Sequence, residues 1–283
     1  MNIQTVMITG AGQMGSGIAQ VFAMAEYDVI LHDIAQEAVE RGMKGIQRNL
    51  EKQVDKGKRS SEELHNIVDR FTLTTNLQEA ERADLIIEAA VENMEVKKSI
   101  FARLDVIAKE DAILATNTSS LPITEIAAVT KSTERLIGMH FMNPVPVMKL
   151  VEIIRGLATS QETYDAVHEV VKTLNKVPVE VNDFPGFVSN RILMPMINEA
   201  IFTLYEGIAT KEAIDEVMKL GMNHPMGPLT LADFIGLDTC LYIMETLHEG
   251  FGDDKYRPCP LLRKYVKAGW LGKKTGRGFY TYS

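Results

Sequence analysis

The sequence contains little cysteine and no excess of positive charge. Cys240 and Cys259 are its only cysteines, and their spacing matches no metal-ligand motif. With 30 Lys and Arg residues against 38 Asp and Glu residues, the formal charge of −8 provides no basic surface for nucleic acid. We therefore expect a protein of a reducing compartment that binds neither a metal ion nor a nucleic acid.

Long apolar runs are also missing. No stretch approaches the ~20 consecutive apolar residues that a membrane-spanning helix requires. Nothing near the N-terminus has the pattern of a signal peptide, and because strand-like residues begin at Ile3 we expect no transit segment. These absences favour a soluble, cytoplasmic protein with a small-molecule partner.

Apolar residues are nevertheless abundant enough for a large core, since they make up 46% of the chain. In the first half, short β-branched apolar runs alternate with longer amphipathic runs, which is typical of a parallel sheet flanked by helices. Strands are predicted at 3–9, 28–33, 71–74, 84–89, 112–116, 135–140, 149–154 and 177–181. The pattern predicts an α/β fold with a Rossmann-like, doubly wound sheet.

Helical segments interrupt this pattern twice. A charged helix is predicted at 37–58 and another from Ser60 or Ser61, so a helical insertion near 37–69 delays the third strand. After the turn-forming run 182–186 the alternation stops. Apolar residues then recur at helical spacing at Met194, Ile197, Ile201, Leu204, Ile214, Val217 and Met218. We therefore predict two domains, 1–183 and 184–283, of which the second is all helical.

A glycine-rich turn follows the first predicted strand and opens a helix-like run. It consists of Gly10, Ala11, Gly12, Gln13, Met14 and Gly15. Its glycines would permit a tight turn, close approach of the backbone to a pyrophosphate, and close packing of helix on strand. The N-terminus of the helix would direct unpaired N–H groups at the phosphates. The turn predicts a dinucleotide site; the alternative is a glycine turn in a non-binding α/β protein.

Asp33 ends the second predicted strand, where an acidic residue accepts hydrogen bonds from the adenosine ribose of a dinucleotide. Ile34, and not an arginine, follows it. Because a carboxylate also repels a 2′-phosphate, the sequence favours NAD over NADP.

Polar side chains gather where the later strands end. Three predicted strands lead into the segments 88–92, 116–120 and 139–144, and ligands of an open parallel sheet bind beyond the carboxyl ends of its strands. His140 and Glu152 are equally far from Pro146, so a turn there would place them opposite each other, with Cβ atoms ~5 Å apart. The carboxylate would orient the imidazole, which could then take the proton of an alcohol as hydride leaves its carbon.

These residues also have structural interpretations. His140 could be a satisfied histidine at a strand end, with Glu152 as a surface ion-pair partner. Thr118 or Ser120 could cap a helix near Pro122, where proline suits the first turn.

Two further features allow two interpretations each. Asn190, near the start of the first helix of the second domain, could donate to a substrate carbonyl or be an ordinary polar residue. The segment 52–59 concentrates cations, which suit either a solvated helix end or the phosphate tail of a nucleotide.

Five ordered motifs resemble the L-3-hydroxyacyl-CoA dehydrogenase family, and within it the short monofunctional bacterial enzymes that act on 3-hydroxybutyryl-CoA. They are GAGQMGSGIA at 10–19, NTSS at 117–120, HFMNP at 140–144, PGFVSNR at 185–191 and GRGFY at 276–280. The resemblance implies hydride transfer between C3 of an S-3-hydroxyacyl-CoA and NAD. It also implies that 1–183 binds NAD, and that 184–283 contributes to the substrate site and to a homodimer or higher homo-oligomer.

The resemblance also implies roles for individual residues. His140 would be the catalytic acid/base with Glu152 as its partner, Ser119 and Asn190 would position the substrate, and Asp33 would bind ribose. Further expected cofactor contacts are Glu92, Lys97, Asn117, Ser119, Asn143 and Lys274.

The CoA portion of the substrate would be bound by Lys56, to which we add Lys52 of the same cationic segment. Two other functions are open at this point. One is a β-hydroxyacid dehydrogenase acting on a free acid, and the other is a non-catalytic NAD-binding protein.

Overall fold

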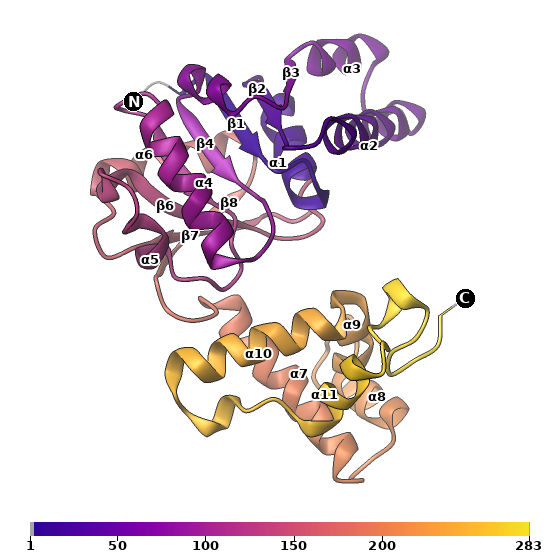
Figure 1. The fold of residues 1–283 in the computed structure, drawn as a ribbon. Coiled ribbons are helices and arrows are strands. Elements are labelled where there is room, and N and C mark those ends of the chain that lie inside the picture. The colour runs from indigo at the N-terminus through magenta and orange to yellow at the C-terminus, as the bar shows by residue number, and fades with distance from the viewer. Residues whose placement is uncertain (1–2, 283) are drawn as a thin grey trace. The chain divides into compact units, whose positions relative to one another are not determined.

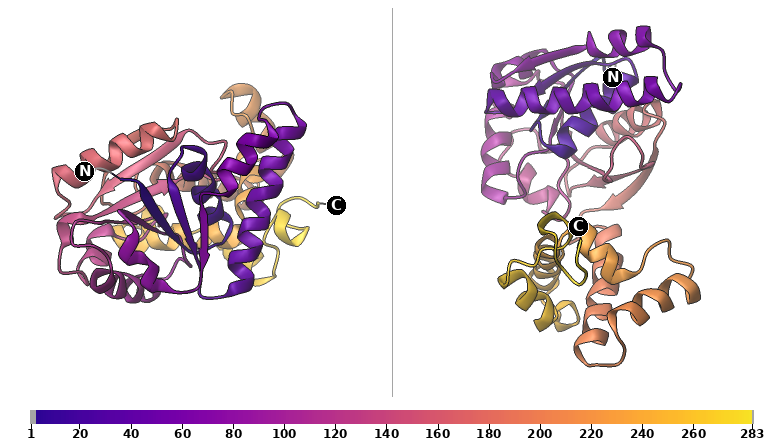
Figure 2. Two further views of the ribbon diagram at one scale, coloured as in Figure 1. Left: turned by 90° about the horizontal axis from the view of Figure 1, so that it is seen from above. Right: turned by 90° about the vertical axis from the view of Figure 1, so that its right-hand side faces the viewer.

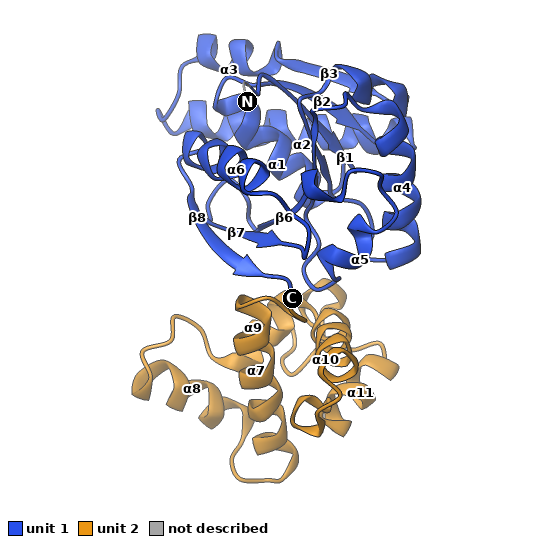
Figure 3. Cartoon of the chain, turned by 90° about the vertical axis from the view of Figure 1, so that its left-hand side faces the viewer, with its two compact units in different colours: residues 1–183 blue, residues 184–283 orange. Residues whose placement is uncertain are grey.

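The computed structural model describes residues 3–282, which form two compact units that divide between Asp183 and Phe184 (Figure 3). Within the described range, no helix is both long and apolar enough to cross a membrane. In the same range, no group of three or more His, Cys, Asp or Glu side chains could hold a metal ion.

The first unit is built on one eight-stranded sheet, which confirms the predicted Rossmann-like class. Its strands are β1 (Thr5–Thr9), β2 (Asp28–His32), β3 (Phe71–Thr74), β4 (Leu85–Glu88), β5 (Ile113–Thr116), β6 (Leu136–Phe141), β7 (Leu150–Arg155) and β8 (Val177–Asn182). Their order is β3-β2-β1-β4-β5-β6-β7-β8, and only β6 and β7 pair antiparallel. All eight predicted strands are present.

Helices flank this sheet on both sides (Figure 2). They are α1 (Gln13–Met24), α2 (Gln36–Asp55), α3 (Ser61–Val68), α4 (Met94–Ile107), α5 (Ile123–Ala127) and α6 (Gln161–Thr173). Because both faces are covered, the central strands are continuously apolar, and Val6, Met7 and Ile8 are completely buried. Ile18 and Phe22 of α1 join the same core.

The predicted helical insertion consists of α2 and α3, which lie beside β3 (Figure 1). The prediction that the first helix continues to residue 58 is wrong, because α2 ends at Asp55 and Gly57 adopts a left-handed conformation with φ of 65°. Ser60 caps α3: its hydroxyl accepts from the N–H of Glu63, whose carboxylate accepts from the N–H of Ser60.

The second unit is helical and has its own core. Its helices are α7 (Ser189–Tyr205), α8 (Lys211–Gly221), α9 (Pro228–Ile235), α10 (Leu237–Phe251) and α11 (Pro260–Lys267). Met194, Ile197 and Ile201 of α7 are buried as their spacing predicts. Val217 of α8 departs from that expectation, since 61% of its surface is exposed.

Candidate active site

His140 and Glu152 form a buried hydrogen-bonded pair. They are direct partners in the antiparallel register of β6 and β7, as their symmetric spacing about Pro146 predicts. Nδ1 of the imidazole lies 2.7 Å from Oε2 of the carboxylate. Glu152 is only 2% exposed, so its interpretation as a surface ion-pair partner is wrong. A carboxylate that accepts Nδ1–H fixes the tautomer of the neutral ring and leaves its basic lone pair on Nε2.

Asn117 connects the end of β5 to the strand that carries His140. Strand β5 ends at Thr116, and the side-chain oxygen of Asn117 accepts a hydrogen bond from the backbone N–H of Phe141, at 2.9 Å. The next residues, Thr118 to Ser120, are thereby held near the strand end that presents His140.

Glu92 fixes the segment that contains Ser119. One oxygen of its carboxylate accepts from the hydroxyl of Thr118 at 2.6 Å and from the backbone N–H of Ser119 at 2.9 Å. Thr118 and Ser120 do not cap α5. That helix is capped by the carboxylate of Asp183, which accepts from the first two N–H groups of the helix at 3.0 and 2.7 Å.

Glu88 and Lys97 form a buried ion pair next to Glu92. Glu88, at the end of β4, is fully buried, and its two oxygens accept from the ammonium of Lys97 at 2.7 and 2.9 Å. The same carboxylate accepts from the hydroxyl of Thr116 and the N–H of Ala90, both at 2.7 Å. Lys97 is 1% exposed and lies 3.5 Å from Glu92. Its ammonium therefore contacts both carboxylates and is shielded from solvent.

The glycine-rich turn has the geometry that a dinucleotide requires. Gly10 has φ of 108°, and a Cβ atom at Gly15 would lie 1.7 Å from the carbonyl oxygen of Gly10, so both positions need glycine. A Cβ at Gly12 would meet nothing within 4 Å. Gly12 thus faces open space, and the first turn of α1 begins directly after it. Asp33 stabilises the turn, since its carboxylate accepts from the N–H of Ala11 at 2.8 Å.

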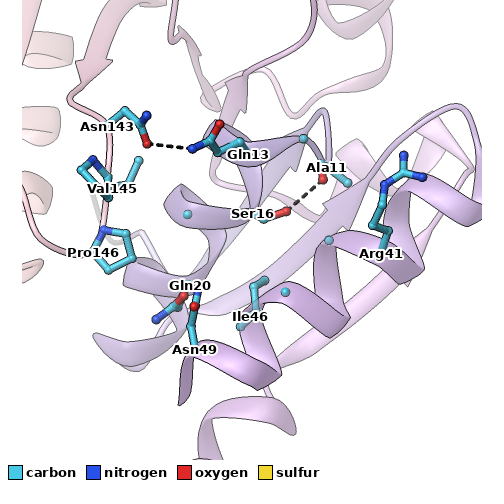
Figure 4. A pocket seen from close by; sticks show the side chains of 15 residues that line it. Ala11, Gln13, Ser16, Gln20, Arg41, Ile46, Asn49, Asn143, Val145 and Pro146 are labelled. Atoms are coloured by element: carbon cyan, nitrogen blue, oxygen red, sulfur yellow. Dashed lines mark hydrogen bonds between the residues drawn. The ribbon is translucent and has the colours of Figure 1, made fainter. Parts of the chain in front are cut away.

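A cavity of about 370 Å³ adjoins the glycine-rich turn (Figure 4). It is lined by the turn, by one face of α2 and by the loop from Asn143 to Pro146. The side-chain amide of Gln13 donates to Asn143 at 3.2 Å, and both residues line the cavity. Arg41 and Asn49 of α2 also line it. Sequence reasoning missed both, because a polar residue on a charged helix gives no signal that it faces a cavity.

The remaining expected site residues belong to other elements. Lys52 is exposed in the last turn of α2, and Lys56 is exposed just beyond it. Asn190 and Lys274 belong to the second unit. Asn190 is buried at the start of α7, and the ammonium of Lys274 pairs with Asp238 of α10 at 2.6 Å.

Comparison with known proteins covers both units. Residues 5–184 match the family model described as 3-hydroxyacyl-CoA dehydrogenase, NAD binding domain, and residues 186–282 match the C-terminal domain model of that family. The chain is 64% identical to a probable 3-hydroxybutyryl-CoA dehydrogenase of Bacillus subtilis over 282 residues, which is 100% of this chain and 98% of the relative. A 3-hydroxybutyryl-CoA dehydrogenase of Clostridioides difficile is 54% identical, with 98% of each chain covered.

Among solved structures, the crystal structure of (S)-3-hydroxybutyryl-CoA dehydrogenase from Ralstonia eutropha matches with a TM-score of 0.97 and 51% identity, and 100% of both chains is covered. These matches confirm the resemblance seen in the five sequence motifs. The chain therefore belongs to the 3-hydroxyacyl-CoA dehydrogenase family of NAD-dependent enzymes.

Proposed function

We propose that this chain interconverts (S)-3-hydroxybutanoyl-CoA and acetoacetyl-CoA with NAD(H), and that His140 transfers the proton. The names of the relatives and of the structural match support the substrate. The observation that carries the chemistry is the buried pair of His140 and Glu152, 2.7 Å apart at the end of β6.

His140 would act through Nε2. In the oxidative direction, the O–H and C3–H bonds of the hydroxyacyl group break and the C3–O bond becomes a carbonyl. NAD⁺, held by the glycine-rich turn and Asp33, would supply the acceptor for the hydride that leaves C3. Nε2 takes the hydroxyl proton, and the positive charge that develops on the ring is stabilised by the Glu152 carboxylate. In the reductive direction, the same nitrogen returns the proton to the carbonyl oxygen.

The residues of the first unit fit a bound NAD. Gly12 offers open space for a pyrophosphate beside the N-terminus of α1, which supplies unpaired N–H groups. The carboxylate of Asp33, which accepts from the N–H groups of Ala11 and Ala35, would bind the ribose hydroxyls through its further lone pairs, and its charge disfavours the 2′-phosphate of NADP. Asn117, Ser119, Asn143 and Glu92 would contact the cofactor, and Lys97 would act through Glu92. Lys274 of the second unit would also contact the cofactor.

Other residues would bind and orient the thioester. Ser119 is held by Glu92 through its backbone, so its hydroxyl can be presented reproducibly to the substrate carbonyl. Asn190 would supply a second polar contact from the helical unit. The exposed ammonium groups of Lys52 and Lys56 would attract the phosphates of CoA. We further propose that the helical unit takes part in self-association.

Oxidation of NADH tests this proposal directly. Reaction rates with acetoacetyl-CoA, longer 3-oxoacyl-CoA thioesters and free acetoacetate should be highest for acetoacetyl-CoA. A preference for acetoacetate would contradict the thioester assignment and favour a free-acid dehydrogenase. Parallel measurements with NADPH test the cofactor, for which we expect lower kcat/KM than for NADH.

A further inference from the structure

A second cavity, of about 240 Å³, lies at the far end of the loop that follows β6. It is lined by apolar residues from the last turn of α1, by residues 146–149 of the loop, and by 174–176 before β8. Three cations line it as well, namely Arg59, Lys149 and Lys176. The described residues that line this cavity include no aspartate or glutamate, although the chain as a whole carries a formal charge of −8.

Lys176 and Arg59 are held by contacts that leave their positive charges largely uncompensated. Lys176 is buried, and its ammonium donates to the carbonyl oxygens of Val145 and Met148 at 2.6 and 2.7 Å. Both partners are neutral, and burial lowers the pKa of Lys176. An anion nearby would offset that cost of desolvation.

Arg59 and Lys149 supply the other two charges. Nε of Arg59 donates to Gln53 at 3.1 Å, which fixes the guanidinium, and the nearest carboxylate is that of Glu63 at 4.0 Å. Lys149 is exposed and forms no ion pair within residues 3–282. Cations from three separate segments of an acidic chain therefore converge on one small cavity.

The loop 143–149 connects this basic cavity to the candidate active site. Asn143, Pro144 and Val145 line the cavity beside the glycine-rich turn, and Pro146 lines both cavities. A ligand that reacts near His140 and extends along this loop would therefore reach the basic cavity with its far end. In an acyl-CoA, the end farthest from the thioester carries a 3′-phosphate.

We propose that the cavity formed by Arg59, Lys149 and Lys176 binds the 3′-phosphate of the CoA thioester, an inference that rests on the proposed function. A phosphomonoester carries nearly two negative charges, and it offers three acceptor oxygens to a guanidinium and two ammonium groups. Lys52 and Lys56 remain available for the pyrophosphate of the same molecule.

Direct binding tests the cavity without turnover. Calorimetric titration with adenosine 3′,5′-bisphosphate and with adenosine 5′-monophosphate should show tighter binding of the bisphosphate by about tenfold, the size expected for charge-assisted hydrogen bonds. Lys149→Gln and Arg59→Gln should each remove most of that difference. Lys131→Gln removes an exposed cation that lines neither cavity, and it should retain the difference. Equal binding of the two nucleotides by the unmodified protein would overturn the inference.

Steady-state kinetics with two thioesters distinguish a wrong phosphate site from a wrong proposed function. With NADH, the unmodified enzyme should have a KM about tenfold lower for acetoacetyl-CoA than for acetoacetyl-dephospho-CoA, which lacks only the 3′-phosphate. Lys149→Gln should raise the KM for acetoacetyl-CoA much more than the KM for acetoacetyl-dephospho-CoA. Turnover of both thioesters with equal KM would refute the phosphate site alone, whereas no turnover of either would refute the proposed function.

Discussion

The carboxylate of Glu88 at the end of β4 binds the ammonium of Lys97 on α4 through both oxygens, at 2.7 and 2.9 Å, and both side chains are buried. Lys97 of this pair also lies close to Glu92, whose carboxylate accepts from the backbone N–H of Ser119. Two charges have thus been taken out of water beside the candidate site. Such a pair is costly to bury and more costly to break, because Glu88 alone would be an uncompensated buried charge and Lys97 alone would keep only its longer contact with Glu92.

Replacement of one partner should therefore destabilise the protein strongly. We expect Glu88→Gln and Lys97→Met each to lower the free energy of unfolding by about 3 kcal/mol. The double variant should lose much less than the sum of the two, because it leaves no isolated charge. Urea denaturation of all four proteins measures this coupling. Additive losses would show that the two side chains do not act as a pair.

His140 and Glu152 should affect turnover and not cofactor binding. His140→Ala and Glu152→Ala are each expected to reduce kcat at least ~100-fold, the lower range of general acid–base effects. The dissociation constant of NADH, measured by fluorescence, should change little. Near-normal turnover of both variants with NADH bound would rule out the assigned roles and favour a non-catalytic NAD-binding protein.

Alanine at two glycines of the same turn should affect different properties, folding stability at Gly15 and NADH binding at Gly12. Gly15→Ala would place Cβ 1.7 Å from a backbone oxygen, so a loss of folding stability is expected. Gly12→Ala meets no protein atom within 4 Å and keeps an ordinary backbone conformation, so its stability should stay within about 1 kcal/mol of the original. If a pyrophosphate occupies the space at Gly12, the added methyl should weaken NADH binding. Unchanged NADH affinity in a folded Gly12→Ala protein would contradict this position for the pyrophosphate.

Asp84 should make stability depend on acid pH. Partial burial acts to raise its pKa, but the hydrogen bonds from Lys109 and from the N–H groups of Thr5 and Gln4 outweigh that effect and lower it. A carboxyl with a lowered pKa in the folded state adds stability above its pKa in the unfolded chain, about 3.9. That stability is lost as the pH falls through the folded-state pKa.

The stability difference between the original protein and Asp84→Asn should accordingly be larger at pH 7 than at pH 3, as measured by urea midpoints. Asp111→Asn changes an exposed aspartate that forms no ion pair within residues 3–282, and it serves as the control. A difference for Asp84→Asn that stays constant between the two pH values would contradict the expected linkage.

Much of the sheet could be predicted because its physical signals are local. Buried parallel strands must be apolar on both faces, and the runs around Val6, Ile86 and Leu114 have that composition. The pairing of His140 with Glu152 could also be predicted locally, because two antiparallel strands joined by one loop pair symmetrically about the centre of that loop.

The polar part of the site was less predictable. Glu88 and Lys97 have charged side chains, which are expected at the surface, and their burial depends on each other and on Thr116 of the neighbouring strand. Similarly, α5 is capped by Asp183, whose carboxylate accepts from the N–H of Ile123, 60 residues earlier in the sequence. Partners so far apart in the sequence leave no pattern along the chain.

The hydrogen bond from Phe141 to Asn117 has a mechanical consequence for His140. Strand β6 runs past the end of β5, whose last paired residue is Thr116 opposite Gly138. His140 thus lies in the part of β6 that extends beyond β5. On one side this part pairs with β7, and on the other the side-chain amide of Asn117 takes the place of a neighbouring strand. The imidazole of His140 is thus carried by a stretch of backbone that is held on both sides, and such a restricted ring suits the proton transfer proposed for it.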